Sequence, residues 1–292
     1  MAAPDDYAQF LERLALQHQR RLADALQTLE GRLAGYIQTA PATDGELFDM
    51  EWALSARSEI RQAMEEEYLA EVQDILGDYQ EVAQQQLNML NTFGQFTRVP
   101  PEVISALQRQ SFQGFEALAS QQLDVLSNGV YQASLTGRGK ADFIEQLRGS
   151  INGIYQASDQ AEIQELVEVA QNATGARQQA AVDRLHRVYA SDRLGNNLRR
   201  YASLYAVDSL NQFSSTLTIT TANEQGIDRF EYYGDLILDS RDFCREHIDK
   251  IYTRAEIEKI WKGEWAGKAP GDPFIVRGGY NCRHQWLPKV EG

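Results

Sequence analysis

Apolar residues at the start of the chain recur with the spacing of a helix. Within residues 5–39, Phe10 and a series of leucines recur at steps of three, four and eight positions, so they share one face. We therefore predict a single amphipathic helix over this segment, with its apolar face turned toward a core. The residues expected on that face are Phe10, Leu14, Leu22, Leu26, Leu29 and Leu33.

Prolines mark the ends of the next two predicted helices. Pro41 and the polar residues after it form a turn, and Pro100 forms a second break, because proline disrupts a helix interior. Between them, residues 46–92 are dominated by Ala, Glu, Gln and Leu, which are strong helix formers. Residues 102–135 also carry apolar side chains at helical spacing. The sequence thus predicts one long helix on each side of the second break.

Shorter helical segments follow. A glycine-containing turn at 136–140 precedes a short helix over 141–154, and helices over 159–172 and 176–222 come after it. The β-branched residues 216–221 fit either a helix end or a strand.

The last part of the chain has a different character. Residues 230–233 and 236–238 are short apolar or aromatic runs separated by a glycine, and this pattern predicts a β-hairpin. Thr253, followed three residues later by Glu256, forms a capping-box pattern that predicts the start of a helix. The predicted fold class is mainly α, with a long helical body followed by a small α+β module. This module, residues 223–292, we call the C-terminal module.

Charge divides the chain into three regions. The net charge is −14, and residues 1–126 carry most of it, with 20 acidic and 8 basic residues. Residues 127–222 hold 9 of each sign, and the C-terminal module holds 13 acidic and 11 basic residues. We therefore predict three domains: an acidic long-helix region, a helical domain and the C-terminal module. Because DNA phosphates bind basic surfaces, the first region is expected to bind protein rather than DNA.

Two further features bear on cellular location. The first residues lack a basic start followed by an apolar run, and no stretch of about 18 apolar residues occurs, so neither a signal peptide nor a membrane span is predicted. Cys244 and Cys282 are the only cysteines, which does not suit a secreted disulfide scaffold. We therefore expect synthesis in the cytoplasm.

Three segments of the C-terminal module carry a specific pattern. They are FEYYG at 230–234, DSRDFC at 239–244 and RGGYNCRHQW at 277–286. An aromatic strand, an Asp-x-Arg-x-x-Cys segment and a closing Asn-Cys-Arg-His segment thus follow one another. The chain thereby resembles the phage head-morphogenesis family, the minor head proteins similar to protein F of phage Mu. The resemblance covers about residues 128–290, and the N-terminal part matches only in being helical.

That resemblance implies a structural role in the virion and no enzyme activity. Family members are similar to proteins present in a few copies near the portal, with roles in head morphogenesis and in genome packaging or ejection. The implied partners are the portal and other head or neck proteins, with several copies of the chain per particle. Contact with genome DNA is expected only outside residues 1–126. The alternative is a helical delivery body that carries a C-terminal enzymatic module, such as a metal-dependent nuclease or a toxin.

Two cysteines and two histidines in the C-terminal module form a candidate clamp. Cys244 and His247 lie three residues apart, and Cys282 and His284 lie two apart, which together make a ligand set that a structural zinc ion accepts. A disulfide between the cysteines would instead close a loop of about 39 residues and stabilise the fold by a few kcal/mol. Packed free thiols are the third arrangement. In each arrangement we expect the two cysteine segments to meet in space.

Charged residues beside the cysteines form a second candidate cluster. Asp239, Arg241 and Arg283 would form ion pairs that hold the two segments in place. A catalytic use of Asp239 with His247 or His284 around a metal ion is the alternative. Because neither a second carboxylate pair nor a phosphate-binding loop accompanies these residues, no catalytic residue is assigned and no cofactor is expected beyond the candidate zinc.

Overall fold

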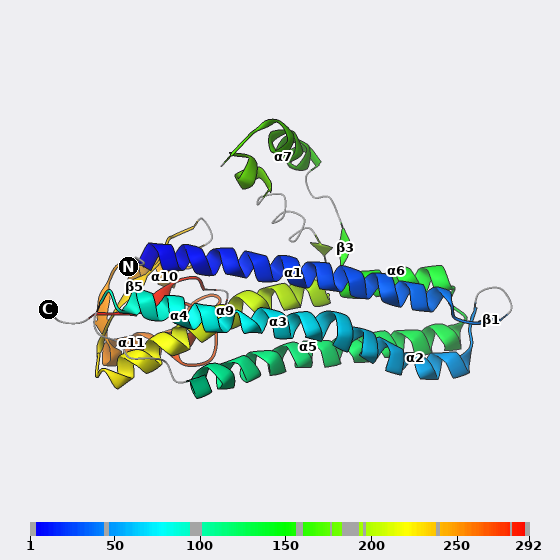
Figure 1. The fold of residues 1–292 in the computed structure, drawn as a ribbon, viewed down its shortest axis with the longest axis horizontal. Helices are drawn as coiled ribbons and strands as arrows, with labels where there is room; N and C mark the ends of the chain where they lie inside the picture. The colour runs from blue at the N-terminus through cyan, green and yellow to red at the C-terminus, as the bar shows by residue number, and fades with distance from the viewer. Residues whose placement is uncertain are drawn as a thin grey trace. The chain divides into compact units, whose positions relative to one another are not determined.

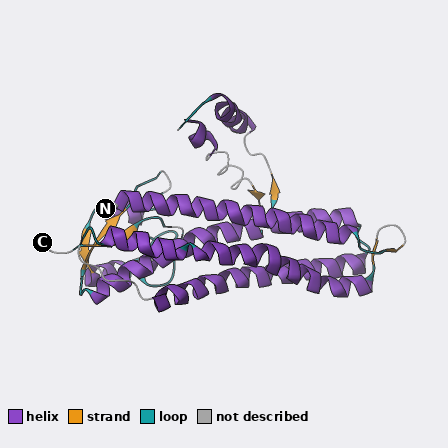
Figure 2. Cartoon of the chain, in the orientation of Figure 1, coloured by secondary structure: helices purple, strands orange, loops and turns teal. Residues whose placement is uncertain are grey.

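The computed structural model describes most of the chain. Helices predominate among the described residues, and the largest sheet lies in the C-terminal module (Figure 2). The predicted fold class, mainly α with a small C-terminal α+β module, is confirmed. The described residues are 4–43, 47–93, 101–155, 160–175, 177–182, 193–194, 197–237, 240–280 and 282–289.

Long helices build the body of the chain (Figure 1). Helix α1 spans Pro4–Gln38, α5 spans Pro101–Thr136 and α9 spans Leu198–Glu224. The shorter helices α6 (Lys140–Ile151) and α7 (Gln160–Asn172) lie between α5 and α9 in the sequence. The bounds predicted for α1, α5 and α6 agree with these to within a few residues.

The apolar face predicted for α1 is buried at five of its six positions, and Phe10 is partly exposed. Leu22, Leu26 and Leu29 have no exposed surface, and Leu33 is 2% exposed. Steps of three and four residues bring these leucines to one side of the helix, where their removal from water stabilises the fold. Asp5 lies in the first turn, where a negative charge interacts favourably with the helix dipole.

The single helix predicted over 46–92 is wrong in detail. It begins later than predicted, contains a π-helical segment and is interrupted at Asp78. The segments are α2 (Met50–Ala63), the π-helix η1 (Met64–Leu69), α3 (Ala70–Gly77) and α4 (Tyr79–Leu90).

A local cap sets the start of α2. Asp49 accepts hydrogen bonds from the backbone N–H groups of Glu51 and Trp52, at 2.8 and 3.1 Å. These bonds satisfy donors that the first turn of a helix leaves unpaired. Just before the cap, strand β1 (Ala42–Thr43) pairs antiparallel with strand β2 (Leu47–Phe48). Helix-forming composition alone therefore places the start of α2 a few residues too early.

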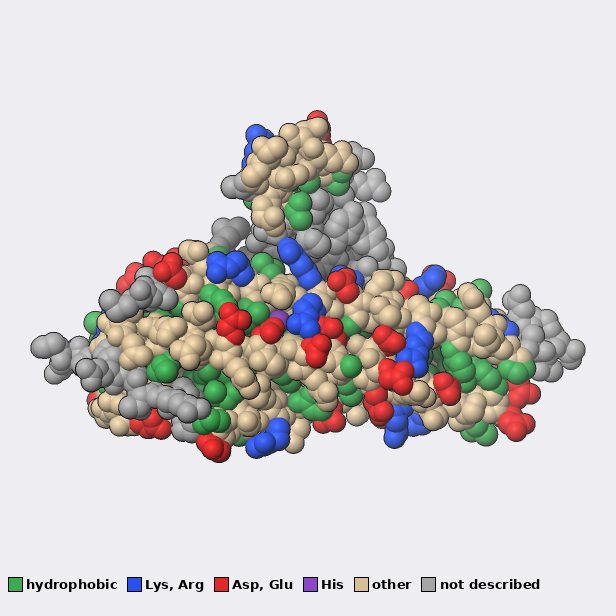
Figure 3. All heavy atoms as spheres, viewed as in Figure 1, with side chains coloured by type: hydrophobic (Ala, Val, Ile, Leu, Met, Phe, Trp, Pro, Cys, Tyr) green, Lys and Arg blue, Asp and Glu red, His purple; other side chains and the backbone are tan. Residues whose placement is uncertain are grey.

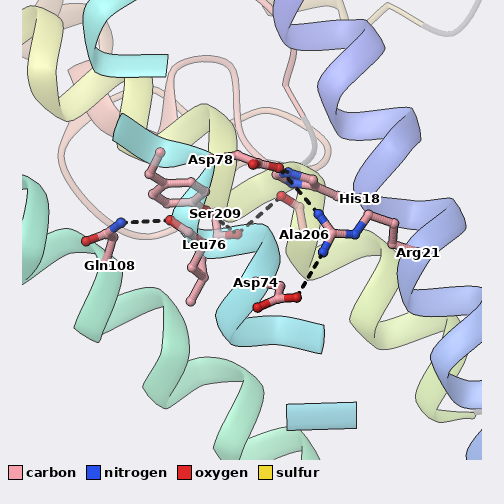
Figure 4. A network of polar contacts seen from close by, with 9 residues as sticks. His18, Arg21, Asp74, Leu76, Asp78, Gln108, Ala206 and Ser209 are labelled. Atoms are coloured by element: carbon pink, nitrogen blue, oxygen red, sulfur yellow. Dashed lines mark hydrogen bonds and ion pairs between the residues drawn. The ribbon is translucent and has the colours of Figure 1, made fainter. Parts of the chain in front are cut away.

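Asp78, which separates α3 from α4, joins a polar network (Figure 4). Its carboxylate lies 3.0 Å from Nε2 of His18 and 3.7 Å from the guanidinium of Arg21, both on α1. Nearby, the side chain of Gln108 on α5 donates to the carbonyl oxygen of Leu76, at 2.7 Å. The interruption at Asp78 thus lies where polar side chains connect neighbouring helices.

The helix predicted over 176–222 is interrupted. The described residues 177–182 are helical, but strand β4 (Arg193–Leu194) follows and pairs antiparallel with strand β3 (Ile154–Tyr155). Helix α9 begins only at Leu198. The prediction failed because strand pairing is a long-range contact, which helix-forming composition does not encode.

The β-branched run at 216–221 belongs to helix α9. The hydroxyl of Thr216 donates to the carbonyl of Gln212, and that of Thr221 donates to the carbonyl of Leu217, at 2.7 and 2.8 Å. Bonds of this kind, one turn back along the helix, satisfy a threonine hydroxyl without leaving the helix. The run therefore resolves as helix.

A three-stranded antiparallel sheet forms the base of the C-terminal module. The strand order is β6 (Ile251–Thr253), β5 (Arg229–Tyr233) and β7 (Gln285–Pro288). Phe230 and Tyr232 are fully buried, whereas their neighbours along β5 are more exposed. This alternation is expected for a strand with one face against a core.

The predicted hairpin between 230–233 and 236–238 is wrong. Strand β5 forms as expected, but Leu236 and Ile237, the described residues of the second run, form no strand. They are 42% and 51% exposed, and both edges of β5 pair with strands from later in the chain. The distant strand β7 forms the longer ladder with β5, so a long-range pairing replaces the local one.

The predicted capping box is confirmed. Thr253 accepts from the backbone N–H of Glu256, and the carboxylate of Glu256 accepts from the backbone N–H of Thr253, at 2.8 Å. Helix α11 (Arg254–Ile260) follows directly. The short helix α12 (Pro273–Val276) is capped by Asp272, which accepts a hydrogen bond from the second residue of the helix.

Acidic and basic side chains are interspersed on the face drawn in Figure 3. Arg32 of α1 pairs with Glu66 and Glu67 of η1, at 2.6 and 3.0 Å, and Arg57 of α2 pairs with Asp124 of α5 at 2.6 Å. Exposed pairs of this kind contribute little individually to stability. Among the described residues, no helix combines the length and apolar character needed to cross a membrane.

The chain divides into two compact units that do not follow the sequence order. The first contains Met1–Arg21, Val72–Phe115 and Leu204–Gly292, and the second contains Leu22–Glu71 and Glu116–Ser203. The C-terminal module belongs to the first unit. The three domains inferred from the distribution of charge stay a prediction.

Candidate metal centre

Two cysteines and a histidine come together in the C-terminal module. Cys244 lies on helix α10 (Asp242–His247), and Cys282 and His284 lie on the segment that leads into β7. Their ligand atoms all lie within 4.8 Å of one another. The predicted meeting of the two cysteine segments is confirmed.

Strand β5 adds a fourth polar atom to this group. The hydroxyl oxygen of Tyr232 lies 3.4 Å from Sγ of Cys244 and 3.3 Å from Sγ of Cys282. Nδ1 of His284 lies 3.6 Å from Sγ of Cys282. Tyr232 pairs with Trp286 across β5 and β7, and His284 precedes Trp286 by two residues, so its side chain lies on the same side. We call Tyr232, Cys244, Cys282 and His284 the Cys–His cluster.

A glycine lets the backbone approach the cluster closely. A Cβ atom on Gly278 would lie 2.7 Å from the Tyr232 hydroxyl, 2.8 Å from Sγ of Cys244 and 3.0 Å from Sγ of Cys282. Separations this short are sterically unfavourable, so any other residue would push the three groups apart. The backbone at Gly278 therefore covers one side of the cluster.

Aromatic rings surround the Cys–His cluster and exclude solvent. Cys244 is 2% exposed, Cys282 is 3% exposed and His284 is 5% exposed. The imidazole of His284 stacks on the ring of Tyr232, with centroids 5.1 Å apart and planes 11° apart. Phe243 meets the same tyrosine ring edge-on, with centroids 5.6 Å apart. Solutes therefore reach the sulfurs only if the module opens.

The two thiols differ in acidity. The pKa of Cys282 is lowered well below its usual value, because the thiol of Cys244 hydrogen-bonds to its sulfur and because His284 and Arg277 favour its negative charge. The pKa of Cys244 is raised, because its hydrogen bond to Cys282 and its burial both favour the neutral thiol. Burial also raises the pKa of Tyr232. Within the pair, these surroundings therefore favour ionisation of Cys282 over ionisation of Cys244.

Arg277 places a buried positive charge near Cys282. Its side chain is 1% exposed, and Nη1 donates to the hydroxyl of Ser215 on α9, at 3.1 Å. Among the described residues its Nε finds no hydrogen-bond partner. Burial lowers the pKa of Arg277, and the negative charge of Cys282 opposes that change. The φ of Arg277 is 56°, a left-handed conformation that is strained for a residue with a Cβ atom.

His247, a predicted zinc ligand, lies outside the Cys–His cluster. Its Nδ1 lies 2.8 Å from the hydroxyl of Tyr252 on β6, and its ring packs on Phe243 with centroids 4.5 Å apart. Burial lowers its pKa. Helical spacing placed His247 on the same face as Cys244, but the hydrogen bond to Tyr252 directs its ring toward the sheet.

The two arginines of the predicted ion-pair cluster bind different partners. Nη1 of Arg283 pairs with Glu12 of α1, at 3.0 Å, whereas the guanidinium of Arg241 donates to the backbone carbonyl of Tyr280. Asp239, the predicted acidic member, lies outside the described residues. The arginines therefore contact two separate places, Arg283 on α1 and Arg241 on the loop before Cys282.

Sequence reasoning did not identify Tyr232 as a member of the cluster, or Arg277 as its charged neighbour. Two weak signals were present. Tyr232 stands at an alternate position of a predicted strand, and two glycines follow Arg277, which indicates a close approach of the backbone. Neither signal identifies the neighbouring groups, because these depend on the pairing of β5 with β7.

No protein-family model matches the chain, and neither does a curated protein or a solved structure. Its function is therefore inferred from its own residues and motifs.

Proposed function

We propose that the chain is a structural protein of a phage virion, a minor head protein that binds at the portal. It would take part in head morphogenesis and in genome packaging or ejection. The observation that carries this proposal is the order of three motifs in the C-terminal module, at 230–234, 239–244 and 277–286, which resembles the head-morphogenesis family. Cys244 and Cys282, from the second and third motifs, lie together in the Cys–His cluster, as expected of a motif that specifies a fold.

The burial of the cluster supports a structural role. A catalytic nucleophile or metal ion must meet its substrate, whereas Cys282 is 3% exposed and is surrounded by aromatic rings. Reactive cysteines generally lie in partly exposed positions, and buried ones are inert. The burial of the cluster therefore favours a structural role for the module over an enzymatic one.

The helical body supports binding to other virion proteins. Acidic residues outnumber basic ones by 20 to 8 in residues 1–126, so this region would attract a basic protein surface. The same charge disfavours its contact with genome DNA. The partners we propose are the portal and other head or neck proteins, with several copies of this chain per particle.

The composition of intact particles tests the proposal. DNA-filled particles would be purified by density gradient and analysed by quantitative mass spectrometry, with chemical crosslinking to identify neighbours. We expect several copies of the chain per particle and crosslinks to the portal. Particles that are complete and infectious without this chain would overturn the proposal.

An activity assay addresses the enzymatic alternative. Full-length protein incubated with DNA or nucleotides and divalent cations is expected to show no turnover. Turnover that is lost in the His284→Gln variant but kept in the His247→Gln variant would assign a catalytic role to the Cys–His cluster. That result would replace the structural role by an enzymatic one.

A further inference from the structure

We propose that the Cys–His cluster is a structural zinc site, in which Cys244, Cys282 and His284 bind the ion and the hydroxyl of Tyr232 occupies the fourth corner. Zinc would connect α10, β5 and the segment that leads into β7. This proposal goes beyond the role in the virion and does not depend on it.

Three of the spacings between the donor atoms are close to those of a zinc tetrahedron. Zn–S and Zn–N bonds of about 2.3 and 2.1 Å place a sulfur and a nitrogen about 3.6 Å apart at the tetrahedral angle. Sγ of Cys282 and Nδ1 of His284 are 3.6 Å apart. An oxygen ligand would also lie about 3.6 Å from each sulfur. The hydroxyl of Tyr232 lies 3.4 and 3.3 Å from the two sulfurs, so a shift of a few tenths of an ångström places it at that corner.

The chemistry of the donors selects zinc among common divalent ions. Two sulfurs and an imidazole suit Zn²⁺, whereas Ca²⁺ and Mg²⁺ prefer oxygen ligands. The exposed fractions of Cys244, Cys282 and His284 do not exceed 5%, so the site is closed to solvent. A site that is closed to solvent and has four protein ligands is the arrangement of structural zinc, whereas catalytic zinc keeps one coordination position open.

Two neighbours of the cluster, Arg277 and Gly278, suit a bound zinc ion. Zinc binds thiolate, and thiolate is stabilised by nearby positive charge. Arg277 supplies such a charge from a fully buried position, and its Nε has no hydrogen-bond partner among the described residues. Gly278 contributes by its lack of a side chain, because a Cβ atom there would lie within 3.0 Å of the Tyr232 hydroxyl and of both sulfurs.

A disulfide between Cys244 and Cys282 is the competing arrangement. Its formation would release two protons and two electrons, so it needs an external oxidant. It would also use neither the imidazole of His284 nor the hydroxyl of Tyr232. Zinc binding uses all four groups, needs no oxidant and is compatible with a reducing cytoplasm.

Metal analysis of the full-length protein tests the proposal. Protein purified under reducing conditions without chelator would be analysed by inductively coupled plasma mass spectrometry, and about one zinc per chain is expected. The variants Cys244→Ser, Cys282→Ser and His284→Gln should lose the metal. The matched control is His247→Gln, because His247 is a buried histidine of the same module that lies outside the cluster, and this variant should keep the zinc.

Cobalt substitution keeps the test independent of variants that fail to fold. Co²⁺ added to reduced, metal-free wild-type protein should give the thiolate charge-transfer bands and the intense d–d bands of a tetrahedral site. Tyr232→Phe removes only the hydroxyl, and we expect it to weaken metal affinity by at least about 10-fold, because even loss of an outer-shell partner weakens affinity by about 10- to 100-fold.

The proposal is overturned if reduced, folded wild-type protein contains no zinc and develops no tetrahedral cobalt spectrum. It is also overturned if Cys282→Ser keeps a full equivalent of zinc. The isolated protein could instead contain a disulfide between Cys244 and Cys282. If it then fails to bind Co²⁺ after reduction, the two cysteines form a disulfide and not a metal site. If Tyr232→Phe binds zinc with unchanged affinity, the hydroxyl of Tyr232 is not the fourth ligand.

Discussion

The helices of the body and the C-terminal module differ in how their sequences supply the side chains of a buried core. In α1, leucines recur every three or four residues, so a continuous stretch of chain carries its own apolar face. In the C-terminal module, β5 contributes the buried side chains of Phe230 and Tyr232 and β7 contributes that of Trp286, whereas β6 contributes only the partly buried Tyr252. A helix of the body is therefore specified largely by its own residues, whereas the module is specified by contacts between distant segments.

The side chains in the two cores differ accordingly. Aliphatic residues such as Leu22 and Leu26 fill the core beside α1, whereas the core of the module combines aromatic rings with sulfur, as in Tyr232, Trp286 and Cys244. Aromatic side chains bury a large apolar area per residue. A small module with little regular structure has few residues to bury, so each ring carries more of its stability.

Truncation of a central ring should have the largest effect and should separate the two regions. Trp286 is 3% exposed, and its indole packs on Tyr232 with centroids 4.5 Å apart. Trp286→Ala should destabilise the module by about 3–5 kcal/mol. Amide hydrogen exchange in β5 and β7 should accelerate, whereas exchange in α2 should be unchanged.

The matched variant in the helical body is Leu26→Ala. Leu26 has no exposed surface, and its truncation should cost about 2–5 kcal/mol. Here exchange in α1 and α2 should accelerate while the sheet keeps its protection. If both variants accelerate exchange equally in all segments, the two regions unfold as one cooperative unit and the comparison fails.

Substitution of two glycines by alanine should change stability in opposite directions. Gly278→Ala places a Cβ atom within 3.0 Å of three atoms of the Cys–His cluster and should destabilise the module by about 1–3 kcal/mol. Gly31, in α1, has no atom within 4 Å of such a Cβ, so Gly31→Ala should stabilise the helix by about 0.5–1 kcal/mol. Denaturant unfolding measures both changes, and a neutral Gly278→Ala would show that the cluster is loosely packed.

Removal of helix caps should have the smallest effect and should be similar in both regions. Asp49 caps α2, and Thr253 caps α11 through its capping box. Asp49→Ala and Thr253→Ala should each cost about 1 kcal/mol, because each leaves backbone N–H groups of a first turn unpaired. The effect is local, so thermal unfolding should show small shifts of similar size. A much larger loss for Thr253→Ala would show that the turn between β6 and α11 supports the whole module.

The fold was predictable from the sequence where residues close together along the chain determine the local structure. The spacing of leucines in α1 and the pair Thr253 and Glu256 act within one or two helical turns, and both predictions are confirmed. The hairpin was wrong because Leu236 and Ile237 are apolar enough for a strand, yet β7 forms a longer ladder with the same partner. Pattern alone does not rank two strands that compete for one edge.

The candidate site was predictable only in part, for a related reason. Cys244, Cys282 and His284 stand out because thiols and imidazoles bind zinc, and the structure brings these three together. The spacing of His247 from Cys244 suggested a fourth ligand on the same helix, but its ring hydrogen-bonds to Tyr252 instead. A spacing rule describes positions along one element, whereas a ligand set is completed by several elements.

The sequence by itself determined the helical body, the position of the C-terminal module and the residue types that suit a metal clamp. Each of these depends on composition or on spacing within a short window, where backbone geometry repeats. Only the tertiary structure decided that the hydroxyl of Tyr232 lies beside both sulfurs, and that Arg277 brings a buried charge to them. These placements follow from the antiparallel register of β5 with β7, because a shift of one residue would turn Tyr232 to the opposite face of the sheet.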